Sequence, residues 1–147
     1  MINSMKLLQR LIISGLCKPQ EIKGCTKADI DRLEAGLTVK LPEAYVEIML
    51  SIGRQAGTFL DDVTFFYPAS IGLTDKSRKL LLESDVTLPD NIYVFTERYF
   101  EQIGFFYLDS GKADPPIYQW TDESPKKTRR VCKSIWQFID EELSARE

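Results

Sequence analysis

Apolar residues recur at helical spacing in four parts of the chain, at residues 5–16, 26–36, 42–53 and 134–143. In each part the apolar side chains are three or four positions apart, which places them on one face of an α-helix. The pattern therefore predicts three amphipathic helices before residue 54 and another that follows the last strands.

The first apolar stripe is expected to be the buried face of its helix, and it consists of Met5, Leu8, Ile12 and Leu16. The run ends at Cys17, as a lipoprotein signal would. However, Gln9 and Arg10 interrupt the apolar core that such a signal requires, and Leu16 is too large for the position before a processed cysteine. We therefore interpret residues 1–25 as a helical extension of the domain.

The second and third helices carry their own boundary signals. Thr26 and Asp29 have the spacing of a capping box at the start of one helix, and Gly36 suits its end. Pro42 suits the first turn of the next helix, which ends at Gly53. The apolar stripe of that helix consists of Tyr45, Ile48, Met49 and Ile52. The pattern predicts two short helices joined by a partly extended hinge.

Two later helices also have recognisable boundaries. Thr74 or Asp75 is suited to cap a helix that continues through Leu82. Ser134 and Gln137 form a second capping box. The apolar stripe that follows this box consists of Ile135, Phe138, Ile139 and Leu143.

Between these helices, β-branched and aromatic residues predict strands at 59–67, 92–95, 103–109 and 117–120. The second and third of these are apolar at nearly every position, which is typical of strands in the middle of a sheet. Helices come first, then mostly strands, then a helix. This order favours a single α+β domain, 1–147, in which helices cover one face or end of a largely antiparallel sheet of at least four strands. The expected core includes Tyr45, Ile48, Met49, Phe65, Phe105, Tyr107, Trp120, Phe138 and Ile139.

The absence of histidine removes the commonest general base and the commonest metal ligand. The three cysteines contain no CxxC pair, and no glycine motif for phosphate is present. The adjacent acids Asp61 with Asp62, or Asp122 with Glu123, could divide acid and base roles, but such pairs in polar loops are usually only solvated. We therefore predict a non-enzymatic protein without metal or cofactor.

The chain has 19 basic and 22 acidic residues and a net charge of -3, which argues against nucleic-acid binding. Its local basic cluster, at 126–130, is interpreted as a solvated loop. Without another apolar run near the length of a membrane span, the protein is expected in the cytoplasm. An acidic protein suits a basic protein partner. The acidic residues that we predict to contact this partner are Asp61, Asp62, Glu83, Asp85, Asp109, Asp114, Asp122 and Glu123.

Three segments of the chain resemble the SUKH superfamily, which includes fungal regulators of cell-wall glucan synthesis and bacterial toxin-immunity proteins. They are IDRLEAGLTVKLPEAY at 30–45, IGFFYLDSGKADPPIYQW at 103–120 and SIWQFIDEEL at 134–143. The resemblance covers about residues 26–143. The matching motif positions are Glu34, Gly36, Leu41, Pro42, Tyr45, Pro115, Pro116, Tyr118 and Phe138.

This resemblance implies an α+β binding module without catalytic activity. It implies an immunity protein that blocks a toxin domain of the nuclease or deaminase type, or alternatively a regulatory scaffold of the Smi/Knr type. Many members have an Asn-Gly pair after the Leu-Pro helix, where this chain has Ile52, Gly53 and Arg54.

Overall fold

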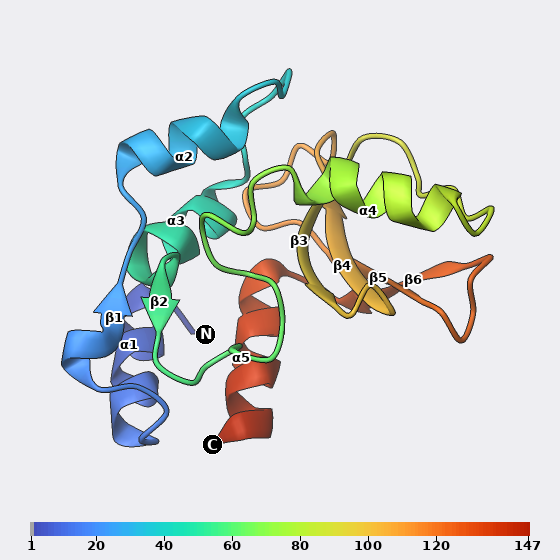
Figure 1. Cartoon of the computed structure of the whole chain (residues 1–147). Helices are drawn as coiled ribbons and strands as arrows, with labels where there is room; N and C mark the ends of the chain where they lie inside the picture. The colour runs from blue at the N-terminus through green and yellow to red at the C-terminus, as the bar shows by residue number, and fades with distance from the viewer. Residues whose placement is uncertain (1) are drawn as a thin grey trace.

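Figure 1 shows the computed structural model of the chain, of which residues 2–147 are described. The N-terminal helices and a small two-stranded sheet lie on one side, and a four-stranded sheet lies on the other. In chain order the elements are α1 (Ser4–Ile13), β1 (Ile22–Lys23), α2 (Lys27–Glu34), α3 (Glu43–Ile52), β2 (Gln55–Ala56), α4 (Leu73–Leu82), β3 (Ile92–Arg98), β4 (Gln102–Tyr107), β5 (Ile117–Thr121), β6 (Thr128–Cys132) and α5 (Ile135–Arg146). The predicted α+β class is confirmed.

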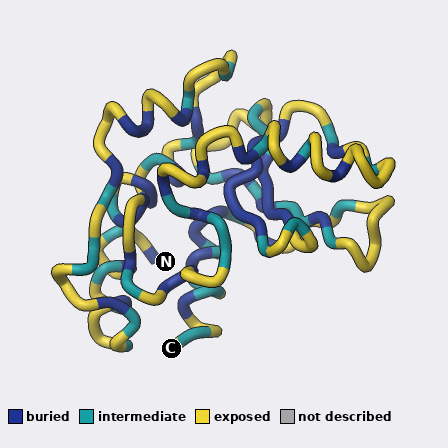
Figure 2. Tube along the Cα trace, in the orientation of Figure 1, coloured by how far each residue is buried: buried dark blue, intermediate teal, exposed yellow. Residues whose placement is uncertain are grey.

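The larger sheet is antiparallel throughout, in the order β3-β4-β5-β6. Because side chains alternate between the two faces of a strand, each face receives its own set of apolar residues. Val94 and Phe105 lie in the cluster that packs against α4, whereas Tyr93 and Phe106 join the main core with α3 and α5. Both strands are buried on both faces, and Figure 2 shows them as the most deeply buried part of the sheet. The predicted place in the middle of the sheet is confirmed for β4 and wrong for β3, which is the first strand in the order and is covered by helices on its two faces.

The main core is centred on Tyr45 of α3, whose side chain has no exposed surface. The ring centroid of Tyr45 lies 5.3 Å from that of Tyr93 and 5.7 Å from that of Phe106. Such aromatic pairs contribute about 0.5–1.5 kcal/mol each beyond the area that they bury. Of the predicted core, Tyr107 and Phe138 are only partly buried, and the buried members are Tyr45, Ile48, Met49, Phe65, Phe105, Trp120 and Ile139.

Helix α1 forms where the sequence predicts it, but its predicted buried face is only partly right: Leu8 and Leu16 pack partly buried against the core, and Met5 and Ile12 do not. Leu7 and Leu11 are completely buried, whereas Met5 is 69% exposed and Ile12 is 42% exposed. The predicted stripe continued to Leu16, which lies beyond the end of the helix at Ile13. Helix α1 therefore packs against α3 through Leu7 and Leu11, which are four positions apart and share one face of the helix.

The strand predicted at 59–67 is also wrong. This segment consists mainly of turns, and within it Thr64 pairs with Glu97 of β3 as an isolated bridge. Phe59 and Phe65 are nevertheless buried, so the apolar run reflects burial of a loop rather than strand geometry. Conversely, the basic cluster at 126–130, which we interpreted as a solvated loop, runs into the edge strand β6 (Thr128–Cys132). Exposed arginines are common on edge strands because they discourage pairing with other chains.

Candidate interaction surface

Two of the eight acidic residues predicted to contact a partner also have partners within the fold. Asp62 forms ion pairs with Arg98 and with Arg146, the latter at 2.9 Å. Asp114 accepts a hydrogen bond of 2.6 Å from the backbone N–H of Ile135, the first residue of α5. Partial burial raises the pKa of Asp114. These carboxylates therefore help to position α5.

The other six residues are exposed and lie in three places. Glu83 and Asp85 follow α4, and Asp109 follows β4. Asp61, Asp122 and Glu123 lie near the opposite end of β4, where the β3–β4 turn meets the β5–β6 turn. The eight residues do not form one continuous surface, but Asp61, Asp62, Asp122 and Glu123 lie around the β3–β4 turn.

Contacts place Asp61, Asp62 and Asp122 beside the β3–β4 turn, and Glu123 follows Asp122 in the chain. The bridge between Thr64 and Glu97 aligns the 61–64 loop with the end of β3. On the other side, the N–H of Asp122 donates to the carbonyl of Glu101 at 2.9 Å. A hollow of about 510 Å³ lies between the loop and the turn. We call this region the hairpin surface, and it comprises Asp61, Asp62, Thr64, Arg98, Tyr99, Phe100, Glu101, Asp122 and Glu123.

The β3–β4 turn has an unusual backbone. Tyr99 and Phe100 occupy its two central positions with φ of 52° and 53°, and the N–H of Glu101 donates to the carbonyl of Arg98 at 2.9 Å. Positive φ at both central positions is the pattern of a type I′ turn, which strongly favours Asn-Gly. In bulky L-residues this conformation brings Cβ too close to the backbone. The turn is therefore strained at two successive aromatic residues.

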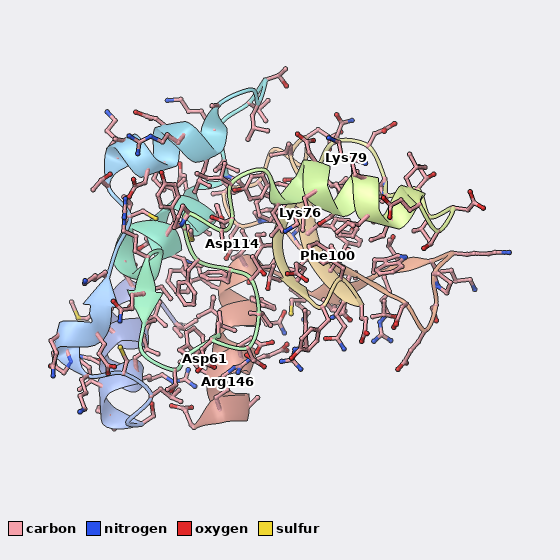
Figure 3. All side chains as sticks on the ribbon, in the orientation of Figure 1. Asp61, Lys76, Lys79, Phe100, Asp114 and Arg146 are labelled. Carbon is pink, nitrogen blue, oxygen red and sulfur yellow. The ribbon has the colours of Figure 1, made fainter. Side chains whose placement is uncertain are left out.

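Side chains from three segments hold this turn in place. The buried Glu97 carboxylate accepts the backbone N–H of Phe100 at 2.8 Å and the hydroxyl of Thr64. From α4, the ammonium of Lys76 lies 5.3 Å from the ring centroid of Phe100, and Figure 3 shows the two side by side. Phe100 is thus fixed against the domain, whereas Tyr99 is 81% exposed. Tyr99 is therefore an exposed side chain on a restrained stretch of backbone.

The sequence interpretation did not identify Tyr99, Phe100 or Glu97. The available signal was TERYFEQ at 96–102, an aromatic pair flanked by charged residues between two strands. This pattern marks a hairpin tip, but its left-handed backbone depends on contacts with Thr64 and Lys76, which are distant in sequence.

The family-motif residues mainly build the fold. The Glu34 carboxylate accepts the backbone N–H of Leu41 at 2.7 Å, which closes the hinge between α2 and α3. Gly36 has φ of 83°, a conformation that glycine adopts readily. Pro42 is the N-cap of α3. In the sheet, the Tyr118 ring stacks on Phe105, with centroids 6.0 Å apart.

The remaining motif residues, Pro115, Pro116 and Phe138, lie just before β5 and in α5. Pro115 is buried and Pro116 is partly buried in the segment before β5. The Phe138 ring meets Phe95 edge-on, with centroids 5.1 Å apart.

Neither a metal centre nor a membrane span is found among residues 2–147. They contain no group of three or more cysteine, aspartate or glutamate side chains arranged to hold a metal ion. No helix in this part of the chain is both long and apolar enough to cross a membrane.

The fold and the motif positions together indicate a small α+β module of the SUKH class. The model of the SMI1 / KNR4 family (SUKH-1) matches residues 24–141 of the 147, and the chain therefore belongs to this family. A comparison with curated proteins found no match. Helix α1 and the last turn of α5 lie outside the matched segment, although both pack on the domain.

Proposed function

We propose that this chain is an immunity-type binding protein of the cytoplasm, which neutralises a basic toxin domain of the nuclease or deaminase type by covering it. Within this family the proposal rests on the hairpin surface. Its carboxylates suit a basic partner, and electrostatic complementarity of this kind raises association rates.

The observation that carries the proposal is the presentation of Tyr99. A strained backbone persists only where surrounding contacts enforce it, and such sites cluster where a protein binds or acts. Tyrosine is enriched among the residues that dominate binding energy at interfaces. A restrained, exposed tyrosine flanked by Asp61 and Glu101 has the composition of an interface anchor.

We further propose that the chain performs no catalysis. It lacks histidine, and in the adjacent acid pair Asp61–Asp62 the second carboxylate is paired with two arginines. Neutralisation by binding needs only a surface that competes with the toxin's substrate, so the composition is consistent with this mode of action.

The test begins with the protein encoded directly upstream of this chain, because immunity proteins of this family are usually encoded next to their toxin. Its expression alone should stop growth, and co-expression of this chain should restore it. Purified partner is then titrated against wild type and Tyr99→Gly, and we expect at least about tenfold weaker binding for the variant, equivalent to about 1.4 kcal/mol.

A matched control is Asn91→Gly, which changes another exposed residue with positive φ, away from the hairpin surface. Its affinity should equal that of wild type. Association rates should also fall as salt rises from about 0.05 to 0.5 M, because screening shortens the reach of the carboxylates. A partner that binds Tyr99→Gly and wild type equally would exclude the hairpin surface.

The second candidate is a regulatory scaffold of the Smi/Knr type, favoured by the family description itself. A neighbouring gene whose product is harmless when expressed alone would favour this alternative.

A further inference from the structure

We infer that a second surface, the groove between α2 and α3, receives an amphipathic helix of a partner protein whose polar positions are basic. We call it the helix groove. This inference does not depend on the proposed toxin, because its argument uses only the shape, apolarity and charge of the groove.

The helix groove is apolar inside and has a volume of about 540 Å³. Its apolar lining comes from α2, the hinge and α3, and consists of Ile30, Leu41, Val46 and Leu50. The volume lies within the range of about 300–1,000 Å³ that is typical of ligand-binding clefts. A cleft of this size accepts several apolar side chains.

Helix α3 has more apolar surface than the domain covers. Its buried stripe faces the core and consists of Ala44, Tyr45, Ile48, Met49 and Ile52. Val46 and Leu50, one helical turn apart, form a second stripe in the groove, where Leu50 is 46% exposed. A helix that is apolar on most sides is normally covered on most sides. The second stripe therefore indicates a missing neighbour.

The charges around the groove indicate which partner surface it favours. Four carboxylates and two ammonium groups line it, from Asp31, Glu34, Glu43, Glu47, Lys27 and Lys40. The acidic excess favours lysine and arginine on the approaching surface and disfavours an anionic lipid surface. Lysine and arginine also cover apolar edges with their methylene stems.

Two of these carboxylates are held by hydrogen bonds. Glu34 accepts the N–H of Leu41 at 2.7 Å, and Glu47 accepts the Ser4 hydroxyl of α1 at 3.1 Å. Part of the acidic rim is therefore restrained before any partner arrives. A preformed groove between two helices, apolar inside and charged at the rim, suits the helix-in-groove mode, in which side chains at i, i+3, i+4 and i+7 enter the cleft.

The probe is a synthetic peptide of about 16 residues, long enough for four helical turns. It carries leucine at i, i+3, i+4 and i+7, lysine on the flanking positions and a fluorophore at one end. We expect fluorescence anisotropy to give a dissociation constant in the micromolar range, weakened at least about fivefold between about 0.05 and 0.5 M salt. Amide NMR shifts should map to α2 and α3.

The groove variant is Leu50→Gln, which changes an exposed helical position and so keeps the fold. It should weaken peptide binding at least about tenfold, because a polar group then enters the apolar cleft. The matched control is Leu82→Gln, at a position on α4 that is 61% exposed, and it should bind as wild type does. A second peptide with glutamate in place of lysine should not bind.

The inference is wrong if the lysine peptide does not bind, if Leu50→Gln leaves its affinity unchanged, or if the glutamate peptide binds equally well. Binding of wild type and Leu50→Gln to vesicles rich in phosphatidylserine tests whether the groove binds a membrane rather than a helix. Vesicle binding that Leu50→Gln abolishes would assign the groove to a membrane instead. Because the peptide is not the toxin, failure of either proposal leaves the other testable.

Discussion

Arg54 and Asp29 form a two-point ion pair that joins the turn after α3 to the start of α2. The guanidinium donates from Nε to Asp29 Oδ2 at 2.7 Å and from its terminal nitrogen to Oδ1 at 2.8 Å. Asp29 is only 1% exposed and also accepts the N–H of Thr26 at 2.9 Å. The same guanidinium lies 4.9 Å from the Tyr67 ring centroid. Arg54, which follows Gly53 at the end of α3, therefore has a structural role.

This pair predicts a particular loss of stability in acid. The Arg54 guanidinium and the N–H of Thr26 hold the pKa of Asp29 well below its ordinary value. A lowered folded-state pKa gives stability that is present above the unfolded-state pKa and is lost as pH falls. The free energy of unfolding in urea should therefore decline below about pH 4, the ordinary range of aspartate.

The variant Arg54→Gln separates the contribution of Asp29 to this loss of stability from that of other carboxylates, which also become protonated in acid. It should be less stable than wild type at neutral pH, where it leaves a buried carboxylate poorly paired. Its stability should also fall less steeply between about pH 4 and pH 2.5 than that of wild type. Parallel curves for the two proteins would contradict the assignment of Asp29.

Tyr99→Gly should stabilise the protein while it weakens partner binding. Glycine adopts positive φ without steric cost, and the exposed tyrosine ring contributes little buried area. We expect the free energy of unfolding in urea to rise by about 0.5–1 kcal/mol after the entropic cost of glycine is included. Asn91→Gly should change it by only a few tenths of a kcal/mol, since asparagine tolerates this conformation. A clear destabilisation by Tyr99→Gly would show that the turn is unstrained.

Leu11→Ala should distinguish the observed buried face of α1 from the face that the sequence predicted. Leu11 is fully buried, so its truncation should cost about 2–4 kcal/mol in urea unfolding. Ile12→Ala, at the neighbouring and partly exposed position, should cost no more than about 1 kcal/mol. If both variants lost the same small amount of unfolding free energy, α1 would not pack on the domain in solution.

The thiols of Cys25 and Cys132 should be unreactive in the folded protein. Burial raises the pKa of Cys25 to about 11, and burial together with the hydrogen bond to Glu141 raises that of Cys132 to about 12. Since the thiolate is the nucleophile, alkylation at pH 8 should be at least about tenfold slower than in urea. Mass spectrometry of digested protein locates the label, and rapid labelling of either residue without denaturant would contradict this.

Local signals in the sequence were sufficient for the helices and two of their caps. The cap predicted at Thr74 or Asp75 is wrong, because α4 begins at Leu73 after Gly72 and the Thr74 hydroxyl accepts the N–H of Val94 in β3. Thr26 and Asp29 form the predicted capping box, and Ser134 accepts the N–H of Gln137, because capping depends on residues three positions apart. The partner of Asp29 was not predictable in the same way, since Arg54 lies 25 positions further along the chain.

The errors have a common physical origin in tertiary context. The 59–67 run is apolar because Phe59 and Phe65 fill the core from turns, which periodicity cannot separate from a buried strand. Strand β6 looked like a loop because an edge strand needs few apolar residues. At the candidate site, the acidic residues were visible in the sequence, but the conformation of Tyr99 depends on contacts across the fold.

The network that Arg10 forms has a consequence for the order of folding. From α1, Arg10 forms ion pairs with Asp140 and, at 2.7 Å, with Glu147. The first of these contacts joins positions 130 residues apart, and the entropic cost of closing a loop rises slowly with its length. Contacts of this range slow folding because the chain must be ordered before they form. During synthesis, α1 can pack on α3 before α5 exists, but Arg10 gains Asp140 and Glu147 only once α5 has been made.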